Sequence, residues 1–145
     1  MARATVDDLV TVARSRIVRY EPADAHAAQS RGSLLVDLRS DVERWEGGVP
    51  AGSFHVPRTV LEWRLDPASR WRNPLLCDPT AEVILLCAHG CSSSLAAGEL
   101  AELGFERTGD VVGGFEAWLA AGLPVVEAPP APAGLPGSGP AAPEV

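Results

Sequence analysis

The stretch Glu82–Leu103 decides the fold and reads EVILLCAHGCSSSLAAGELAEL. Its first part, Glu82–Cys87, is apolar throughout after the glutamate, which is typical of a strand buried inside a parallel sheet. A short loop containing Gly90 follows, and Ser92–Leu103 then has the pattern of a helix that ends at the next glycine. A strand that leads directly into a helix is the repeating unit of α/β folds.

The same alternation continues on both sides of this stretch. It predicts an α/β fold with a central, mostly parallel sheet of about five strands flanked by helices. Further strands are expected at Ile17–Tyr20, Leu34–Leu38, Ser53–Val56 and Asp110–Val112, with an extended piece at Leu123–Val126. Further helices are expected at Thr5–Arg16, Glu21–Ser30, Asp41–Glu46, Thr59–Leu65 and Phe115–Ala121.

The chain length of 145 residues points to one domain with additions at its ends. Residues 1–16 are interpreted as an N-terminal helical extension, and residues 17–126 as the folded domain. From residue 127 onward Pro, Ala and Gly dominate, and no hydrophobic periodicity remains. Such a composition has little to bury, so residues 127–145 are predicted to form a disordered tail.

Charge and composition exclude several classes of protein. The formal net charge is −7, and all 12 basic residues are arginine without a cluster, which argues against nucleic acid as a partner. No apolar run is long enough to cross a bilayer, and the first residues do not resemble a signal peptide, so a cytoplasmic protein without membrane contact is expected. Three cysteines form no disulfide framework or four-ligand zinc site, so neither a metal nor another cofactor is expected.

The loop after the predicted strand Glu82–Cys87 is a candidate catalytic site. Ligands of open α/β sheets bind beyond the carboxyl ends of the strands, where Cys87 stands. Loop amides and the start of the following helix would stabilise a thiolate there, and Ser92 and Ser93 can donate hydroxyl hydrogen bonds. Gly90 allows close approach of the backbone. By itself the loop is equally compatible with a buried structural cysteine, which is a common fate of this residue type.

Four motifs follow one another in order along the chain. They are DLR at 37–39, Glu43 followed by GGVPAGSFHVP at 47–57, the strand and loop at 83–93, and VGGFEAW at 112–118 with AGLPV at 121–125. Together they resemble the motifs of the rhodanese family over roughly residues 17–126. The loop is similar to that of single-domain thiosulfate sulfurtransferases of this family.

The resemblance implies an enzyme of the thiosulfate:cyanide sulfurtransferase type. Cys87 would be the catalytic nucleophile that carries sulfur as a persulfide. The loop residues Ala88, His89, Gly90, Cys91, Ser92 and Ser93 would bind the donor and the persulfide. The donor would be thiosulfate or a similar anion, and the acceptor cyanide or a cellular thiol, which could belong to a protein.

The chain departs from the family's pattern in the loop, where Ser92 stands at a position that is arginine in many members. The loop therefore has no cationic side chain. Arg58, just after the predicted strand Ser53–Val56, is the candidate to bind the sulfonate of the donor, although a solvated surface arginine is an equally good interpretation. Asp37 and Arg39 are interpreted as a structural ion pair, by analogy with the family.

Several alternatives remain open at this point. A non-catalytic rhodanese-like module that binds a partner or senses redox state is the main alternative function. A cysteine phosphatase on the same fold would need an arginine at the position of Ser93. Cys91 is either a resolving thiol or a small loop residue, and His89 either assists proton transfer or serves through its backbone. Trp63 and Trp71 could rim the pocket.

Overall fold

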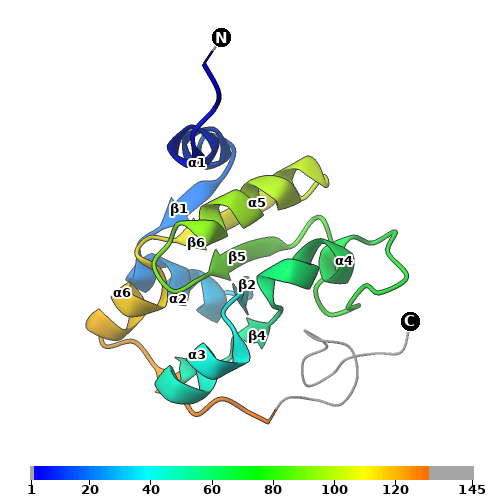
Figure 1. Ribbon diagram of the computed structural model, residues 1–145. Coiled ribbons are helices and arrows are strands. Elements are labelled where there is room, and N and C mark those ends of the chain that lie inside the picture. Colours follow the sequence, from blue (N-terminus) through cyan, green and yellow to red (C-terminus); the bar gives the residue numbers. More distant parts are fainter. Residues whose placement is uncertain (1, 131–145) are drawn as a thin grey trace.

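The computed structural model describes residues 2–130 and has a five-stranded parallel sheet at its centre (Figure 1). The strand order is β1-β6-β5-β2-β4, and every neighbouring pair runs parallel. A separate antiparallel pair joins β3 and β7. The strands are β1 Val18–Tyr20, β2 Leu34–Asp37, β3 Val49–Pro50, β4 Phe54–His55, β5 Glu82–Leu86, β6 Arg107–Val111 and β7 Val125–Val126.

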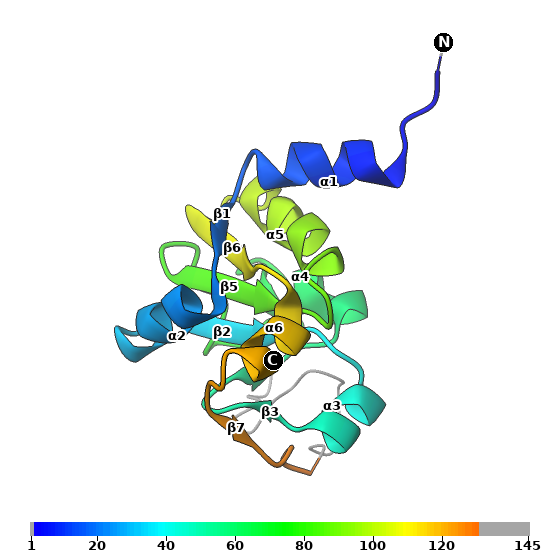
Figure 2. The same ribbon diagram turned by 90° about the vertical axis from the view of Figure 1, so that its left-hand side faces the viewer.

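Helices cover both faces of the central sheet, as Figures 1 and 2 show from two sides. One hydrophobic cluster joins the sheet to α4 and α5, and a second joins it to α2 and α6. The helices are α1 Val6–Arg14, α2 Pro22–Ser30, α3 Asp41–Gly47, α4 Leu61–Leu65, α5 Ser92–Glu102 and α6 Gly114–Ala120, with a 3-10 turn at Arg58–Val60.

The middle strand β5 shows how the apolar run seen in the sequence is used. Val83 and Leu85 face the cluster with α4 and α5, whereas Ile84 and Leu86 face the cluster with α2 and α6. All four side chains are fully buried. A strand covered on both faces requires apolar residues at every position, which explains the lack of alternation in the sequence.

The predicted fold class is confirmed, and most elements lie within one or two residues of their expected bounds. The strand expected at Asp110–Val112 begins earlier, at Arg107. Its first residues are polar or glycine, so no apolar pattern marked them, but pairing with β1 and β5 makes them a strand. The short β3–β7 pair was not predicted. The predicted tail over 127–145 lies mostly outside the described residues.

Helix α1 lies across α5, at the edge of the domain where β1 begins (Figure 2). Thr5 caps α1, since its hydroxyl accepts from the amide of Asp8 at 3.1 Å, as its sequence position predicted. Ala13 is buried against Gly98 of α5, where a methyl group on the glycine would already be in tight contact at 3.0 Å. Within residues 2–130, no helix has the length and apolar character needed to cross a membrane.

Candidate active site

The thiol of Cys87 lies directly after β5, in the loop that leads into α5. Its Sγ atom accepts hydrogen bonds from the backbone N–H groups of Gly90 at 3.1 Å and Ser93 at 3.3 Å. The thiol donates to the hydroxyl oxygen of Ser93 at 3.2 Å. Only 7% of Cys87 is exposed. Two main-chain amides thus point at one buried sulfur, which is an arrangement that stabilises negative charge on it.

The surroundings of Cys87 act on its pKa in opposite directions. Burial raises the pKa, because it disfavours the thiolate. Hydrogen bonds with the side chain and amide of Ser93, the side chain of Ser92 and the amide of Gly90 lower it. The hydrogen bonds outweigh burial, so the pKa of Cys87 lies below the ordinary value of a cysteine thiol. A larger thiolate fraction at neutral pH makes this sulfur a better nucleophile.

Replacing Ser93 with alanine is expected to raise the pKa of Cys87, because the hydrogen bond with the Ser93 side chain is one of the contacts that lower it. Alkylation by iodoacetamide at neutral pH should slow about threefold to tenfold, the effect of one hydrogen bond to a charged group. The rate is measured against pH in a background in which Cys77 and Cys91 are serine. Ser53→Ala is the matched control, because its hydroxyl donates to the Pro50 carbonyl outside the loop. If the pH at which alkylation reaches half its maximal rate is unchanged in Ser93→Ala, Ser93 does not lower the pKa of Cys87.

The first turn of α6 holds the loop from the opposite side. The N–H groups of Phe115 and Glu116 donate to the carbonyl oxygens of Cys87 at 2.8 Å and Ala88 at 3.2 Å. Gly114 has a φ of +63° and lies so close that a Cβ there would be 2.7 Å from the carbonyl carbon of Ala88. The glycine pair of the VGGFEAW motif therefore fixes the backbone around Cys87.

A buried carboxylate lies behind the loop. Asp110 at the end of β6 is fully buried and accepts from the hydroxyls of Ser93 at 2.8 Å and Ser94 at 2.7 Å. It also pairs with the guanidinium of Arg19 from β1 at 3.0 Å. The thiol of Cys87 is thus connected to Asp110 through one hydroxyl. Sequence reasoning missed Asp110 and Arg19, although an acidic residue within a predicted buried strand indicates that a polar or basic partner lies nearby.

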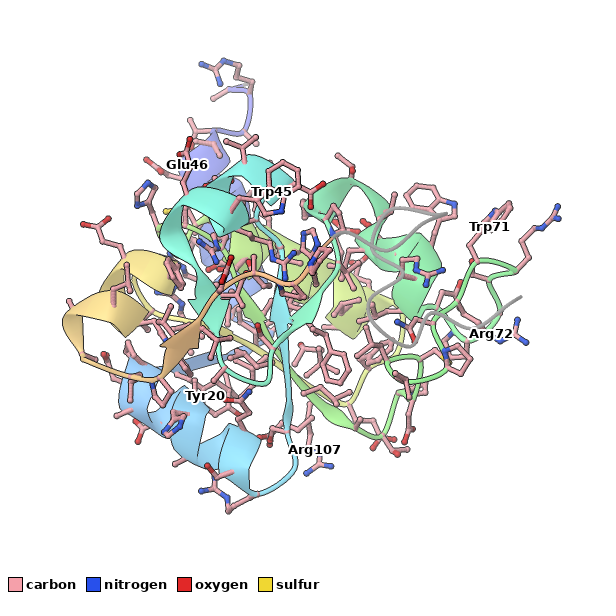
Figure 3. The ribbon with its side chains drawn as sticks, turned by 90° about the horizontal axis from the view of Figure 1, so that it is seen from below. Tyr20, Trp45, Glu46, Trp71, Arg72 and Arg107 are labelled. Atoms are coloured by element: carbon pink, nitrogen blue, oxygen red, sulfur yellow. The ribbon has the colours of Figure 1, made fainter. Side chains whose placement is uncertain are left out.

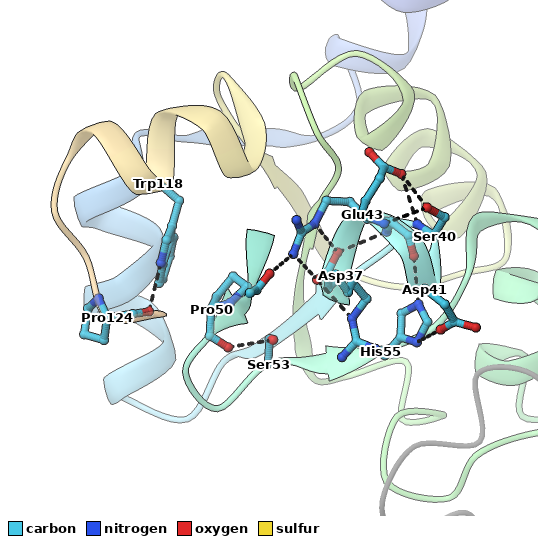
Figure 4. A network of polar contacts seen from close by, with 12 residues as sticks. Asp37, Ser40, Asp41, Glu43, Pro50, Ser53, His55, Trp118 and Pro124 are labelled. Carbon is cyan, nitrogen blue, oxygen red and sulfur yellow. Dashed lines mark hydrogen bonds and ion pairs between the residues drawn. The ribbon is translucent and has the colours of Figure 1, made fainter. Parts of the chain in front are cut away.

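Asp37 lies at the carboxyl end of β2 (Figure 4) and forms an ion pair with Arg39 at 2.9 Å. The guanidinium of Arg39 donates to both carboxylate oxygens, at 3.1 and 2.9 Å, and both side chains are buried. It also donates to the carbonyl of Gly48 and lies 3.6 Å above the ring of Phe115. Arg44 of α3 lies 3.4 Å from the same carboxylate. These contacts join β2, α3 and α6, which supports the predicted structural role.

A cavity of about 410 Å³ begins at the two residues that follow Cys87. Ala88, His89, Arg39 and Phe115 line it, together with three acidic residues, Glu43, Glu46 and Glu116. His89 is exposed, and its Nδ1 lies 2.9 Å from Glu116 rather than near the sulfur.

Other predicted residues lie elsewhere. Arg58 donates to both carboxylate oxygens of Glu62, at 3.0 and 3.1 Å, and lines a different cavity against α1 and α5. Its role in donor binding therefore stays a prediction. Cys91 is exposed and precedes α5 as a free thiol, so a resolving role also stays untested. Trp63 lines a separate small cavity, and Trp71 lies on the outer loop after α4, away from Glu46 at the acidic cavity (Figure 3).

Comparisons with known proteins show which family this chain is similar to. Residues 21–121 match the family model of the rhodanese-like domain. The chain is 37% identical over 97 residues to the thiosulfate sulfurtransferase GlpE of Glaesserella parasuis, covering 67% of this chain and 81% of that protein.

Two solved structures are similar in fold. A protein of unknown function from Rhodopseudomonas palustris, described as a possible tyrosine phosphatase, has a TM-score of 0.80 at 29% identity, covering 87% of this chain and 97% of that one. The polysulfide-sulfur transferase homodimer of Wolinella succinogenes has a TM-score of 0.64 at 29% identity, covering 81% and 83%. Since the family model spans most of the chain and the relative is aligned over most of its own length, this chain belongs to the rhodanese-like domain family.

Proposed function

We propose that this chain is a sulfurtransferase that moves sulfane sulfur from thiosulfate or a related donor to a thiophilic acceptor. The observation that carries this function is the buried Sγ of Cys87, which accepts hydrogen bonds from the amides of Gly90 and Ser93. These amides stabilise a thiolate before the reaction and a persulfide anion after it. The names of the thiosulfate sulfurtransferase and the polysulfide-sulfur transferase among its relatives support the same activity.

The reaction has two steps. In the first, the Cys87 thiolate attacks the outer sulfur of thiosulfate, the S–S bond of the donor breaks, and sulfite leaves with the bonding electron pair. In the second, cyanide or a thiolate attacks the outer sulfur of the persulfide, and the Cys87 thiolate is regenerated. The amides of Gly90 and Ser93 face Sγ of Cys87. In the persulfide the negative charge lies on the outer sulfur bonded to Sγ, which is held in the same amide-lined loop.

The acceptor is a thiol, on a small molecule or on a protein, or cyanide in an assay, and the location is the cytoplasm. All three cysteines are free thiols, which fits a reducing compartment. The acidic residues Glu43, Glu46 and Glu116 line the cavity and favour acceptors and donors that carry little negative charge. Thiosulfate must therefore rely on the loop amides, with Arg58 as the candidate for its sulfonate.

The test is intact-mass and peptide mass spectrometry after treatment with thiosulfate, polysulfide or mercaptopyruvate. A gain of one sulfur atom on the peptide that carries Cys87 is expected with at least one donor, and Cys91→Ser should gain it equally. No adduct from any of the three donors would favour the non-catalytic, partner-binding or redox-sensing module.

A phosphatase activity is not favoured by the loop. A cysteine phosphatase clamps its phosphate with an arginine, which would stand at position 93. Here that position is Ser93, whose buried hydroxyl lies between Cys87 and Asp110. Hydrolysis of p-nitrophenyl phosphate that depends on Cys87, in the absence of sulfur transfer, would reverse this choice.

A further inference from the structure

The carbonyl group of Gly90 is held by two arginines from the N-terminal part of the chain. Its oxygen accepts hydrogen bonds from Nη2 of Arg14 at 3.0 Å and Nη2 of Arg19 at 2.9 Å. The amide of the same glycine donates to Sγ of Cys87 at 3.1 Å. Hydrogen bonds from charged donors are about twice as strong as neutral ones, so this carbonyl is firmly oriented.

The position of Gly90 leaves the loop little freedom to compensate for a lost contact. Its φ is +87°, and a Cβ would lie 2.7 Å from the amide nitrogen of Gly113. The loop is therefore packed against the glycine pair on one side and held by Arg14 and Arg19 on the other. A shift of the Gly90 carbonyl changes the direction of the adjoining amides, including the one that faces the sulfur.

Arg14 also contacts the network behind the loop. Its Nε donates to the hydroxyl of Ser94 at 3.0 Å, and that hydroxyl donates to Asp110 at 2.7 Å. Arg19 pairs directly with Asp110, which offsets its charge. Among residues 2–130, no carboxylate lies within ion-pair distance of Arg14. Of the two arginines that contact the loop, Arg14 is therefore the one whose positive charge has no ion-pair partner among residues 2–130.

We propose that Arg14 of helix α1 is a positioning residue for sulfur transfer, which holds the Cys87 loop in its sulfur-binding conformation and supplies a positive charge that the loop lacks. This role rests on the proposed function. Arg14 lies outside the 21–121 range of the family model, at the end of a helix that docks on α5. The loop from Ala88 to Ser93 itself carries no lysine or arginine. The chain thus places its cation behind the loop.

The charged groups around the Cys87 loop come from several elements. Arg14 lies on α1, Arg19 on β1 and Asp110 on β6. His89 of the loop pairs with Glu116 of α6 at the surface, and buried Arg39, which lines the same cavity, is paired with Asp37. Glu43 and Glu46 of α3 line the same cavity as Ala88 and His89. Of the two arginines that contact the loop, only Arg19 has an ion-pair partner among residues 2–130, so replacing Arg14 removes the positive charge that is not paired.

The experiment compares Arg14→Met, Arg14→Lys and the control Arg16→Met. Arg16 lies in the turn directly after α1 and forms an exposed ion pair with Glu102 at 2.6 Å, away from the loop. Arg14→Met should lower kcat/KM about tenfold, as expected for loss of a hydrogen bond from a charged donor. It should also move the pH midpoint of Cys87 alkylation upward. Arg14→Lys should recover part of both effects, and Arg16→Met should match the parent protein.

The outcomes separate a local effect from general loss of structure. Wild-type kcat/KM and an unchanged alkylation midpoint in Arg14→Met would overturn the role of Arg14. Equal losses in Arg14→Met and Arg16→Met would overturn it too, because they would trace the effect to docking of α1. If Arg14→Met does not fold, as judged by circular dichroism, Arg14→Lys must still show an upward-shifted midpoint. The pH midpoint of Cys87 alkylation reports the pKa of the thiol and can be measured even if the parent protein transfers no sulfur. An absence of sulfur transfer in the parent protein would contradict the proposed function without deciding the role of Arg14.

Discussion

Replacing Cys87 with serine should abolish sulfur transfer, lowering kcat/KM by more than about a thousandfold. A hydroxyl in the same position stays protonated at neutral pH and cannot form a persulfide, even though the amides of Gly90 and Ser93 remain in place. The measurement is formation of thiocyanate from thiosulfate and cyanide. The buried position of Cys87 tolerates the smaller side chain, so thermal unfolding should show a folded protein.

The other two cysteines provide matched controls in the same chain. Cys91 is exposed and Cys77 is partly exposed, and neither is hydrogen-bonded to the Cys87 sulfur. Cys91→Ser and Cys77→Ser should keep sulfur transfer within about twofold, as expected for surface substitutions. Substantial activity in Cys87→Ser, or its loss in Cys91→Ser, would show that sulfur passes through a different thiol.

Gly114→Ala is expected to have the largest effect on stability among single-methyl additions near the site, at least about 3 kcal/mol. The residue has a φ of +63°, where an L-amino acid is strained. In addition, its methyl group would collide with the backbone of Cys87 and Ala88. Because both are main-chain atoms next to the nucleophile, sulfur transfer should fall together with the free energy of unfolding.

Gly122→Ala separates these two causes. Gly122 has a similar φ of +70°, but no heavy atom lies within 4 Å of the position of its added methyl group. The control should therefore lose only the conformational contribution, about 1–2 kcal/mol, and keep full activity. Both variants are compared by urea unfolding and by the thiocyanate assay. Equal losses in the two variants would show that close packing against the loop contributes nothing.

Local sequence patterns were sufficient to predict the central strand β5 and the loop that follows it. Val83–Leu86 is apolar at every position because both sheet faces are covered, and this pattern needs no knowledge of the partners. The end of this strand, followed by Gly90 and the serines, predicted that Cys87 lies in a loop whose backbone N–H groups point at its sulfur. The start of β6 could not be predicted in this way, because Arg107 and Gly109 become strand residues only through pairing with β5 and β1.

By itself, the sequence determined the parallel α/β fold, the position of Cys87 after β5 and the charge deficit of its loop. These features depend on hydrophobic patterns and on residues close together in the chain. The tertiary structure alone decided which distant charges lie near the loop. It brings Arg14 and Arg19 to the carbonyl of Gly90. The physical reason is that these contacts span more than 70 positions, as with Arg14 and Gly90, and exist only once β1 pairs with β6 and α1 docks on α5.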